Sequence, residues 1–377
     1  MTDMRFLQIH WLTSYPATLL NRDDSGLAKR LPFGGVVRTR VSSQCLKRHW
    51  RTVEDEWALK NIGLEMAVRS RETPERRILP ALEQAQAGSE DIRNATVLAL
   101  AIQLYGDKAE DKSKRQALLL GEPEIAYLAG KSIEIAKTAT DAKGAAEAMK
   151  KLFKEEKGNL AALRKNGVLE AGLEAALFGR MVTSDPEANT DAAIHVAHAF
   201  TVHEEASESD YFTVVDDLAQ EAGETGAGGI FDTELTAGLF YGYVVVDIPA
   251  LIANVGGDAA LAGRICEHLI HLIATVSPGA KKGSTAPYAV AQTMLVEAGR
   301  RQPRTLADAF RAPSEALIAD ADRALAEHLR KIDAAYGAKE ERRFLSIEGA
   351  DLSGATRTDL DGLGVFARDA AVAKSGS

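Results

Sequence analysis

Apolar and polar residues follow a strand-like pattern in several short segments of the chain. The segment 5–13 is rich in aromatic and β-branched side chains, which is typical of a β-strand. The same composition predicts further strands at 36–41, 211–215, 238–248 and 288–297. Between the strands expected at 211–215 and 238–248 lies the glycine-rich segment 221–229, which predicts the tip of a long hairpin.

Helical spacing marks other segments. Ser42 and Ser43 stand where a helix N-cap is expected, and apolar residues then recur with helical spacing at Leu46, Trp50, Val53 and Trp57. Lys47 and Arg51 share another face of this helix. The region 62–175 is rich in Ala, Leu, Glu and Lys and predicts a helical insertion. An amphipathic helix is expected at 258–276, and further helices and a frayed tail from 303 onward.

The order strand, helix, hairpin, helix, strand predicts an α+β fold with a ferredoxin-like or RRM-like core carrying insertions. The longest apolar segment, 244–255, is interrupted by Asp247 and Pro249, so no membrane span is expected. The N-terminus lacks the features of a secretory signal, and the two cysteines, Cys45 and Cys266, form no CxxC pair. A reducing cytoplasm is the expected location.

Charge is distributed very unevenly along the chain. The net charge is -9, which taken alone argues against binding a polyanion. The segment 22–51, however, holds eight basic and two acidic residues, so it carries +6 and the remainder carries -15. A basic segment set apart in an acidic chain indicates a localised phosphate-binding groove.

Several groups of this basic segment suit a phosphate. The N-terminus of a helix presents unpaired N–H groups and the positive end of its dipole, so a phosphate would fit there with the basic helix residues behind it. The candidate set is Arg22, Lys29, Arg38, Arg40, Ser42, Ser43, Gln44, Lys47, Arg48 and Arg51. A second interpretation remains open, in which the serines only cap the helix, Gly34 and Gly35 only close a turn, and the basic residues face water.

The same segment carries a resemblance to a known family. Leu20-Asn21-Arg22-Asp23-Asp24, the Phe33-Gly34-Gly35 turn, and Arg40-Val41-Ser42-Ser43-Gln44 followed by Leu46-Lys47-Arg48 resemble the N-terminal motif of CasC, the backbone subunit of the type I-E CRISPR effector Cascade. Further matches follow in the family's order at 179–184, 195–199, 211–218, 238–241 and 278–281. The resemblance therefore extends from the N-terminus to about Phe310.

This resemblance implies a non-catalytic subunit that stacks in several copies along the CRISPR guide RNA (crRNA) and presents it for pairing with target DNA. It implies an RRM-like palm, helical fingers and a β-hairpin thumb. The expected boundaries are palm at 1–61, 176–210 and 238–302, fingers at 62–175, thumb at 211–237, and C-terminal helices with a tail at 303–377. The implied partners are crRNA, target DNA, further copies of the chain and other Cascade subunits.

The resemblance also assigns roles to residues. Arg22, Lys29, Ser42, Gln44, Lys47, Arg48 and Arg51 would hold guide phosphates. Met181 would be an apolar wedge against bases, Leu235 a second apolar contact, and Lys281 lies in a matched motif. The stretch 131–165 holds nine basic and five acidic residues, and it is either a solvated helix face or a contact to target DNA.

Three other classes of protein compete with this interpretation. His195, His198 and His203, or His268 and His271 near Cys266, have spacings that can bind zinc, but no carboxylate or cysteine completes a recognisable pattern, so no metal and no cofactor are expected. Asp23 and Asp24 lie where type III backbone subunits use an aspartate to cut target RNA, which would make the chain a metal-dependent nuclease. A scaffold that binds no RNA would not need the basic segment.

Overall fold

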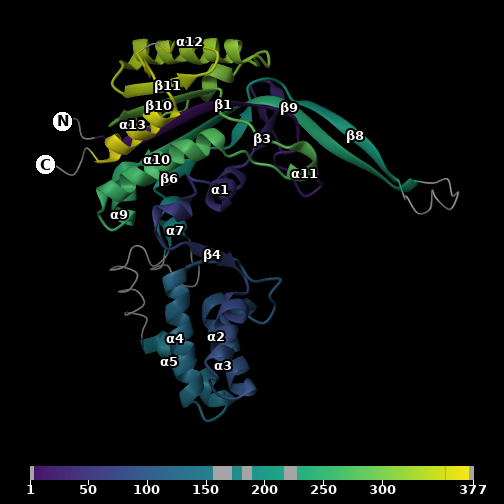
Figure 1. Ribbon diagram of the computed structural model, residues 1–377, viewed down its shortest axis with the longest axis vertical. Coiled ribbons are helices and arrows are strands. Elements are labelled where there is room, and N and C mark those ends of the chain that lie inside the picture. Colours follow the sequence, from purple (N-terminus) through teal and green to yellow (C-terminus); the bar gives the residue numbers. More distant parts are fainter. Residues whose placement is uncertain (1–3, 156–171, 181–188, 216–226, 353, 373–377) are drawn as a thin grey trace. The chain divides into compact units, whose positions relative to one another are not determined.

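The computed structural model describes residues 4–155, 172–180, 189–215, 227–352 and 354–372, and the chain divides into two compact units (Figure 1). The first, here called the sheet unit, comprises Met1–Ala58, His195–Ile248 and Ala262–Ser377. The second, the helical unit, comprises Leu59–Ile194 and Pro249–Leu261. Together they give a mixed α+β architecture, as the sequence predicts.

The sheet unit is built on a mixed sheet that has ten strands within the described residues. Its order is β12-β11-β10-β1-β9-β7-β3-β2, with β6 and β8 also pairing with β9. The strands are β1 Phe6–Thr18, β2 Arg30–Phe33, β3 Val36–Val41, β6 Ile194–Val196, β7 Ala199–Thr201, β8 Ala206–Val215, β9 Ala227–Asp247, β10 Thr293–Gly299, β11 Glu341–Ser346 and β12 Thr356–Arg357. The pair β11–β12 is parallel, whereas β1 runs antiparallel to both β9 and β10.

Four central strands and two helices of the sheet unit come in this order along the chain, with other elements between them: β1, α1 (Ser43–Thr52), β7, β9, α10 (Ala259–Thr275) and β10. These four strands lie side by side in the order β10-β1-β9-β7, and each neighbouring pair is antiparallel. Helices α1, α10 and α13 (Leu360–Val372) lie on one face of the sheet, and α12 (Ile318–Tyr336) lies on the other (Figure 1).

One aromatic contact explains how α1 is fixed to the sheet. The ring of Trp11 on β1 meets the ring of Trp50 on α1 edge to face, with centroids 6.2 Å apart. Gly242 on β9 lies directly opposite Trp11, and a Cβ atom there would stand 2.1 Å from the Trp11 ring. A glycine in the middle of this strand is therefore required for the tryptophan to lie across it.

The opposite face of the sheet is buried under α12. Leu12, Tyr241 and Leu295 from the central strands pack with Leu325 and Leu329 of the helix. Phe310, in the segment that leads into α12, belongs to the same cluster and is fully buried. These residues of the central strands are therefore buried on this side of the sheet.

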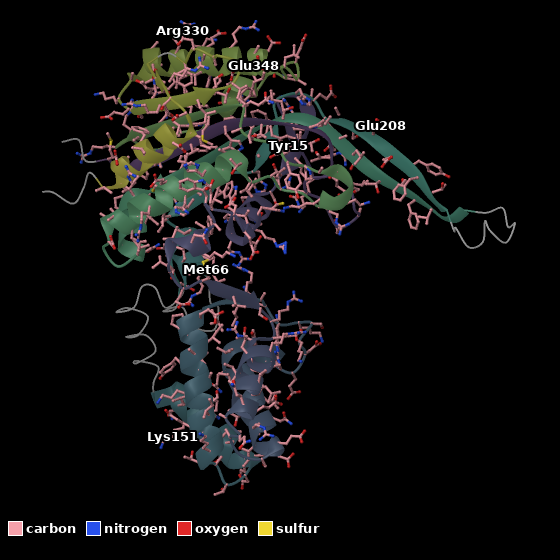
Figure 2. All side chains as sticks on the ribbon, viewed as in Figure 1. Tyr15, Met66, Lys151, Glu208, Arg330 and Glu348 are labelled. Atoms are coloured by element: carbon pink, nitrogen blue, oxygen red, sulfur yellow. The ribbon has the colours of Figure 1, made fainter. Side chains whose placement is uncertain are left out.

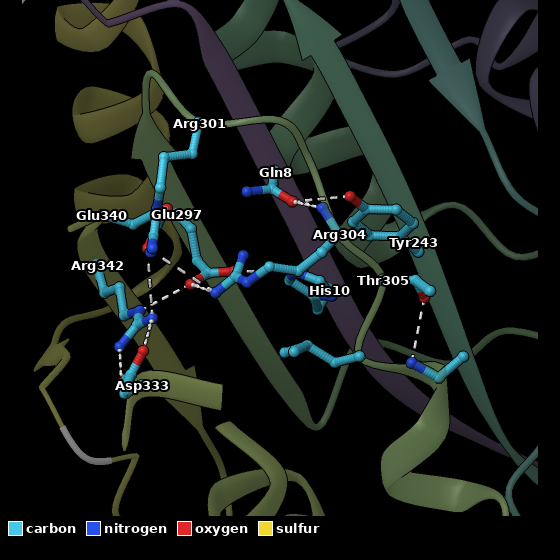
Figure 3. A network of polar contacts seen from close by, with 12 residues as sticks. Gln8, His10, Tyr243, Glu297, Arg301, Arg304, Thr305, Asp333, Glu340 and Arg342 are labelled. Carbon is cyan, nitrogen blue, oxygen red and sulfur yellow. Dashed lines mark hydrogen bonds and ion pairs between the residues drawn. The ribbon is translucent and has the colours of Figure 1, made fainter. Parts of the chain in front are cut away.

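A buried network of ions ties this covering layer to the sheet (Figure 3). Glu297 of β10 accepts hydrogen bonds from Arg304 at 2.8 and 2.9 Å, from Arg342 of β11 at 2.7 Å and from His10 at 3.2 Å. Arg342 also holds Asp333 of α12. Burial alone would raise the pKa of Glu297, but the hydrogen bonds and charges of its partners outweigh it and lower that pKa. The carboxylate is thus fixed in its ionised form.

The helical unit has a core of its own. Its elements are β4 Ala67–Ser70, α2 Leu79–Gln84, α3 Glu90–Tyr105, β5 Leu118–Gly121, α4 Glu122–Thr138, α5 Ala142–Glu155, α7 Leu173–Phe178 and α9 Ile248–Asn254. Leu82, Leu100, Leu128 and Met149 from successive helices form one apolar cluster. Among the described residues, no helix is both long and apolar enough to cross a membrane.

The structure confirms several expected elements and corrects others. The strand at 36–41 and the helix near 258–276 are present with nearly the expected bounds. The first helix ends at Thr52, so Trp57 does not continue its apolar stripe but stacks on His271, with ring centroids 3.5 Å apart. The region after 303 is not only helical, because β11 adds a strand to the sheet beside β10. The expected frayed end, 373–377, lies outside the described residues.

Candidate nucleic-acid interface

The loop 21–29 is part of the connection between β1 and β2, and hydrogen bonds within it and to the start of α1 shape it. The side-chain oxygen of Asn21 accepts from the backbone N–H of Ser42 at 2.9 Å, which ties the start of the loop to the start of α1. The carboxylate of Asp23 accepts from the N–H groups of Ser25 and Leu27 at 2.9 and 3.0 Å. The loop therefore presents its side chains from a defined position next to α1.

The two serines at the start of α1 serve the helix itself. Ser42 is the N-cap, and its hydroxyl accepts from the N–H of Cys45 at 3.3 Å. Ser43 is buried and donates from its hydroxyl to the side chain of Gln44. Gln44 is exposed at this helix end. Ser42 therefore caps the helix. Of Ser42, Ser43 and Gln44, only Gln44 has an exposed side chain.

Cations from separate parts of the chain gather beside α1. Lys29, at the end of the loop, and Arg48, on the helix, both act on the thiol of Cys45: burial raises the pKa of Cys45 to about 11, and the two cations oppose the rise. Arg22 and Arg48 are exposed, while Lys29, Lys47 and Arg51 are half-buried. Five of the predicted phosphate ligands therefore lie on the loop or on the adjacent helix.

Two further basic groups join them. His49 of α1 has a lowered pKa, chiefly because it is buried, and Lys282 and Arg48 lower it further. Lys282 begins the short helix α11 (Lys282–Thr285) and is exposed. The segment before it is tied to the chain just ahead of the loop, because the N–H of Ala280 donates to the carbonyl of Leu19 at 2.9 Å.

Arg40 and His198 also lie close to Lys29. A guanidinium N–H of Arg40 donates to Nδ1 of His198 at 3.0 Å, and Arg40 also donates to the carbonyl of Arg30. Burial lowers the pKa of His198, and the charges of Arg40 and Lys29 lower it further. The cation cluster is here defined as Lys29, Arg40, Arg48 and Lys282. It is drawn from four segments and lies wholly within the sheet unit.

The sequence does not identify Lys282 and His198 as members of this group. Lys282 directly follows the matched motif 278–281, from which only Lys281 is predicted. The Nζ of Lys281 donates to the hydroxyl of Thr233 at 2.5 Å and is half-buried. His198 lies in the matched motif 195–199 and has a spacing that can suit a metal ligand, but neither feature predicts a place beside the phosphate-binding residues. Proximity in the folded chain, which no local pattern encodes, brings both residues to the cluster.

Arg38 has a place that does not suit a phosphate ligand. Its side chain is fully buried, and its guanidinium donates to the backbone carbonyls of Phe33, Thr201 and Phe310 at 3.0 to 3.1 Å. Burial lowers the pKa of Arg38. This arginine joins β3 to β7 and to the chain leading into α12, so it belongs to the core and not to the candidate interface.

The two apolar candidates are treated differently by the structure. Leu235 lies half-buried on β9, opposite Glu208 of β8, at the base of the long hairpin (Figure 2). Further out on the same hairpin, Phe212 and Phe231 are opposite one another, stacked with centroids 5.6 Å apart, and exposed. Met181 lies outside the described residues.

The histidines considered for zinc have other partners. His203 accepts from the N–H of Leu239 at 3.1 Å and donates to the carbonyl of Glu204. His268 donates to the carbonyl of Trp57, and His271 stacks on the ring of that tryptophan. Within the described part of the chain, no group of three His, Cys, Asp or Glu side chains is placed to hold a metal ion.

Comparison of the sequence with known protein families finds one match. A family model described as CT1975-like protein matches residues 7–366, which is nearly the whole chain. The chain belongs to the CT1975-like protein family. No curated protein sequence matches this CT1975-like protein significantly.

Solved structures similar to this CT1975-like protein come from RNA-guided assemblies. One is a chain of a structure described as "CRISPR RNA-guided surveillance complex, pre-nicking", which is 26% identical with a TM-score of 0.77 and covers 96% of this chain and 100% of its own. Another, from a "CRISPR RNA-guided surveillance complex", is 21% identical with a TM-score of 0.58, covers 96% and 99%, and supports the fold alone.

Proposed function

We propose that this CT1975-like protein is the crRNA-binding backbone subunit of a CRISPR surveillance complex, of type I-E, acting in antiviral defence in the cytoplasm. The observation that carries the proposal is the cation cluster, because four segments of an acidic chain bring basic side chains to one place beside α1. The structural likeness to chains of RNA-guided surveillance complexes supports the same function. Phosphate contacts of this kind bind RNA without reading its sequence.

The sheet unit would be an RRM-like palm. The strand order β10-β1-β9-β7, with α1 and α10 as the two crossover helices, supports this assignment. In RRM domains aromatic side chains on the open sheet surface stack against bases. Here that surface is covered by α12, so the guide would be held by the 21–29 loop, α1 and α11 and not by the sheet.

The other parts of the family architecture follow from the same proposal. The β8–β9 hairpin would be the thumb, and its exposed Phe212 and Phe231 would meet bases, together with Leu235. Further copies of the chain and other subunits of the complex would be neighbours along the guide. The helical unit would be the fingers. Lys143, Lys150 and Lys154 are exposed on α5 and would contact target DNA, while 156–165 of this stretch lies outside the described residues.

We further propose that the chain has no catalytic role. The alternative, a type III-like nuclease, needs Asp23 or Asp24 to bind Mg²⁺. Asp23 already accepts two backbone hydrogen bonds that shape the loop, which supports a structural role for its carboxylate.

Replacing Arg48 by alanine tests the proposed function. The measurement is affinity for a single-stranded RNA of arbitrary sequence over a range of salt concentrations. We expect R48A to weaken binding and to reduce the slope of log K against log salt by about 0.7 to 1, since the variant neutralises one phosphate fewer. R330A is the matched control, because Arg330 is an exposed helix arginine on α12, on the other face of the sheet (Figure 2). An equal slope for wild type, R48A and R330A would contradict the proposal.

A further inference from the structure

The base of the β8–β9 hairpin is joined to the 21–29 loop through acidic side chains. Glu234 of β9 accepts from the backbone N–H of Ala28 with one carboxylate oxygen and from Nη2 of Arg30 with the other. Glu205, which directly precedes β8, accepts from Nε of Arg30. Strand β9 and the residue directly before β8 therefore both contact the end of the loop, each through one glutamate.

The two glutamates of this contact are largely buried, and Arg30 is half-buried. The side chain of Glu234 is 10% exposed, that of Glu205 15% and that of Arg30 31%. The hydrogen bond from Arg30 to Glu205 is the main reason why the pKa of Arg30 is raised, and the charges of both glutamates add to it. Charge-assisted hydrogen bonds in such a setting are stronger than exposed ion pairs.

Arg30 is consequently not a ligand for phosphate, although it lies in the middle of the basic segment. Its charge is more than balanced by the two glutamates. The carbonyl of Arg30 accepts a hydrogen bond from Nε of Arg40. The backbone N–H of Arg40 in turn donates to the carbonyl of Lys29 at 2.7 Å, so these three residues are joined to one another. Lys29 and Arg40 are two of the four members of the cation cluster.

We propose that Glu234 is a positioning residue: it locks the 21–29 loop to the base of the β8–β9 hairpin and thereby holds Lys29, Arg40 and Arg22 where they can engage the RNA backbone. The inference rests on the proposed function. Glu234 would then favour the binding of a polyanion through the loop that it positions. Its negative charge alone would oppose that binding. The hairpin and the phosphate-binding loop then act as one unit.

The direction in which RNA affinity changes when Glu234 is removed tests this inference. Removing a negative charge near an RNA site strengthens binding if the charge acts only through space. E208A removes the same charge from the same hairpin. The side chain of Glu208 is exposed and forms no hydrogen bond among the described residues, so E208A is the matched control. We expect E208A to bind RNA equally or more tightly than wild type. E234A should bind more weakly, by about fivefold at 0.1 M salt for each phosphate that the protein no longer neutralises, with a reduced salt slope.

A second measurement separates positioning from general destabilisation. Hydrogen exchange of the Ala28 amide should accelerate in E234A while the amides of the central strands β1 and β10 keep their protection. E234Q retains one acceptor oxygen and should fall between E234A and wild type in both exchange and affinity. A protein unfolded throughout would lose protection everywhere and would contradict a local role.

The outcomes distinguish this inference from the proposed function. If wild type binds RNA with a normal salt slope but E234A and E208A behave alike, Glu234 does not position the loop and the proposed function stands. If wild type does not bind RNA, the proposed function fails. The exchange of the Ala28 amide then still reports whether Glu234 holds the loop.

Discussion

At the scale of single residues, Asp322 is the buried charge with the least support. It lies on α12, only 5% exposed, and neither carboxylate oxygen has a hydrogen-bond partner among the described residues. Burial raises the pKa of Asp322, and the neighbouring hydroxyl of Thr293 opposes the rise only in part. The folded chain therefore disfavours the ionised carboxylate of Asp322 relative to the unfolded chain, in contrast to Glu297, whose partners favour the ionised form.

Replacing Asp322 by asparagine should stabilise the protein at neutral pH. The pKa of Asp322 is higher in the folded chain than in the unfolded chain. The contribution of this group to the free energy of unfolding is therefore fully present below its unfolded pKa, and it is lost as pH rises through its folded pKa. D322N removes that loss, so its free energy of unfolding should exceed that of wild type at pH 7 by on the order of 1 kcal/mol. The gain should vanish in acid, which denaturant titrations at several pH values would check.

Asp320, at the start of the same helix, supplies the control. It forms an ion pair with Arg323 near the surface. D320N should therefore show no gain at neutral pH. A D322N protein that is less stable than wild type at pH 7 would mean that the ionised carboxylate has a favourable partner, and the assignment would be wrong.

At the scale of elements, Arg38 connects β3, β7 and the segment before α12 through backbone carbonyls. Replacing it by methionine should remove the donor from the two buried carbonyls of Thr201 and Phe310 and from the partly buried carbonyl of Phe33. We expect a loss of roughly 3 kcal/mol or more of unfolding free energy, since each unsatisfied buried group costs about 1 to 3 kcal/mol. The salt slope of RNA binding, measured below the melting temperature, should stay that of wild type. A normal stability with a reduced slope would restore Arg38 as a phosphate ligand.

Elements whose pattern is local could be predicted from the sequence. The strand β3 and the helix α10 carry their apolar residues at regular spacing, and Ser42 marks the start of α1. The strand β11 could not, because Glu341, Arg342 and Arg343 argue against a buried strand. Arg342 becomes tolerable there only through Glu297, 45 residues away, and Asp333. The predicted end of α1 is wrong because Trp57 fits the helical spacing yet packs on His271.

The same division holds for the candidate site. Charge segregation located the segment 22–51, and most of its exposed or half-buried cations do lie on the loop or α1. Composition could not tell a surface arginine from a core one, so Arg30 and Arg38 looked like Arg22 and Arg48. Their hydrogen bonds to Glu234, Thr201 and Phe310 come from residues more than 160 positions away.

At the scale of the whole molecule, charge is separated within one chain. The segment 22–51 carries +6 and the remainder -15, so most of the excess positive charge that the proposed RNA site uses comes from one short segment of an acidic chain. Two free copies, each with a net charge of -9, repel one another at long range. On the proposed function, RNA would neutralise the basic segments and bring several copies together, because contacts to its backbone recur at every nucleotide.

The length of the RNA should consequently set the number of copies bound. We expect the mass of complexes formed on RNAs that lengthen by a constant increment to rise in steps of one protein chain, measured by native mass spectrometry. The steps should be the same for RNAs of unrelated sequence, since backbone contacts carry no base information. Without RNA the protein should stay monomeric at the same concentration. A single protein chain bound at every RNA length, or steps that depend on base sequence, would contradict a backbone subunit that stacks along its guide.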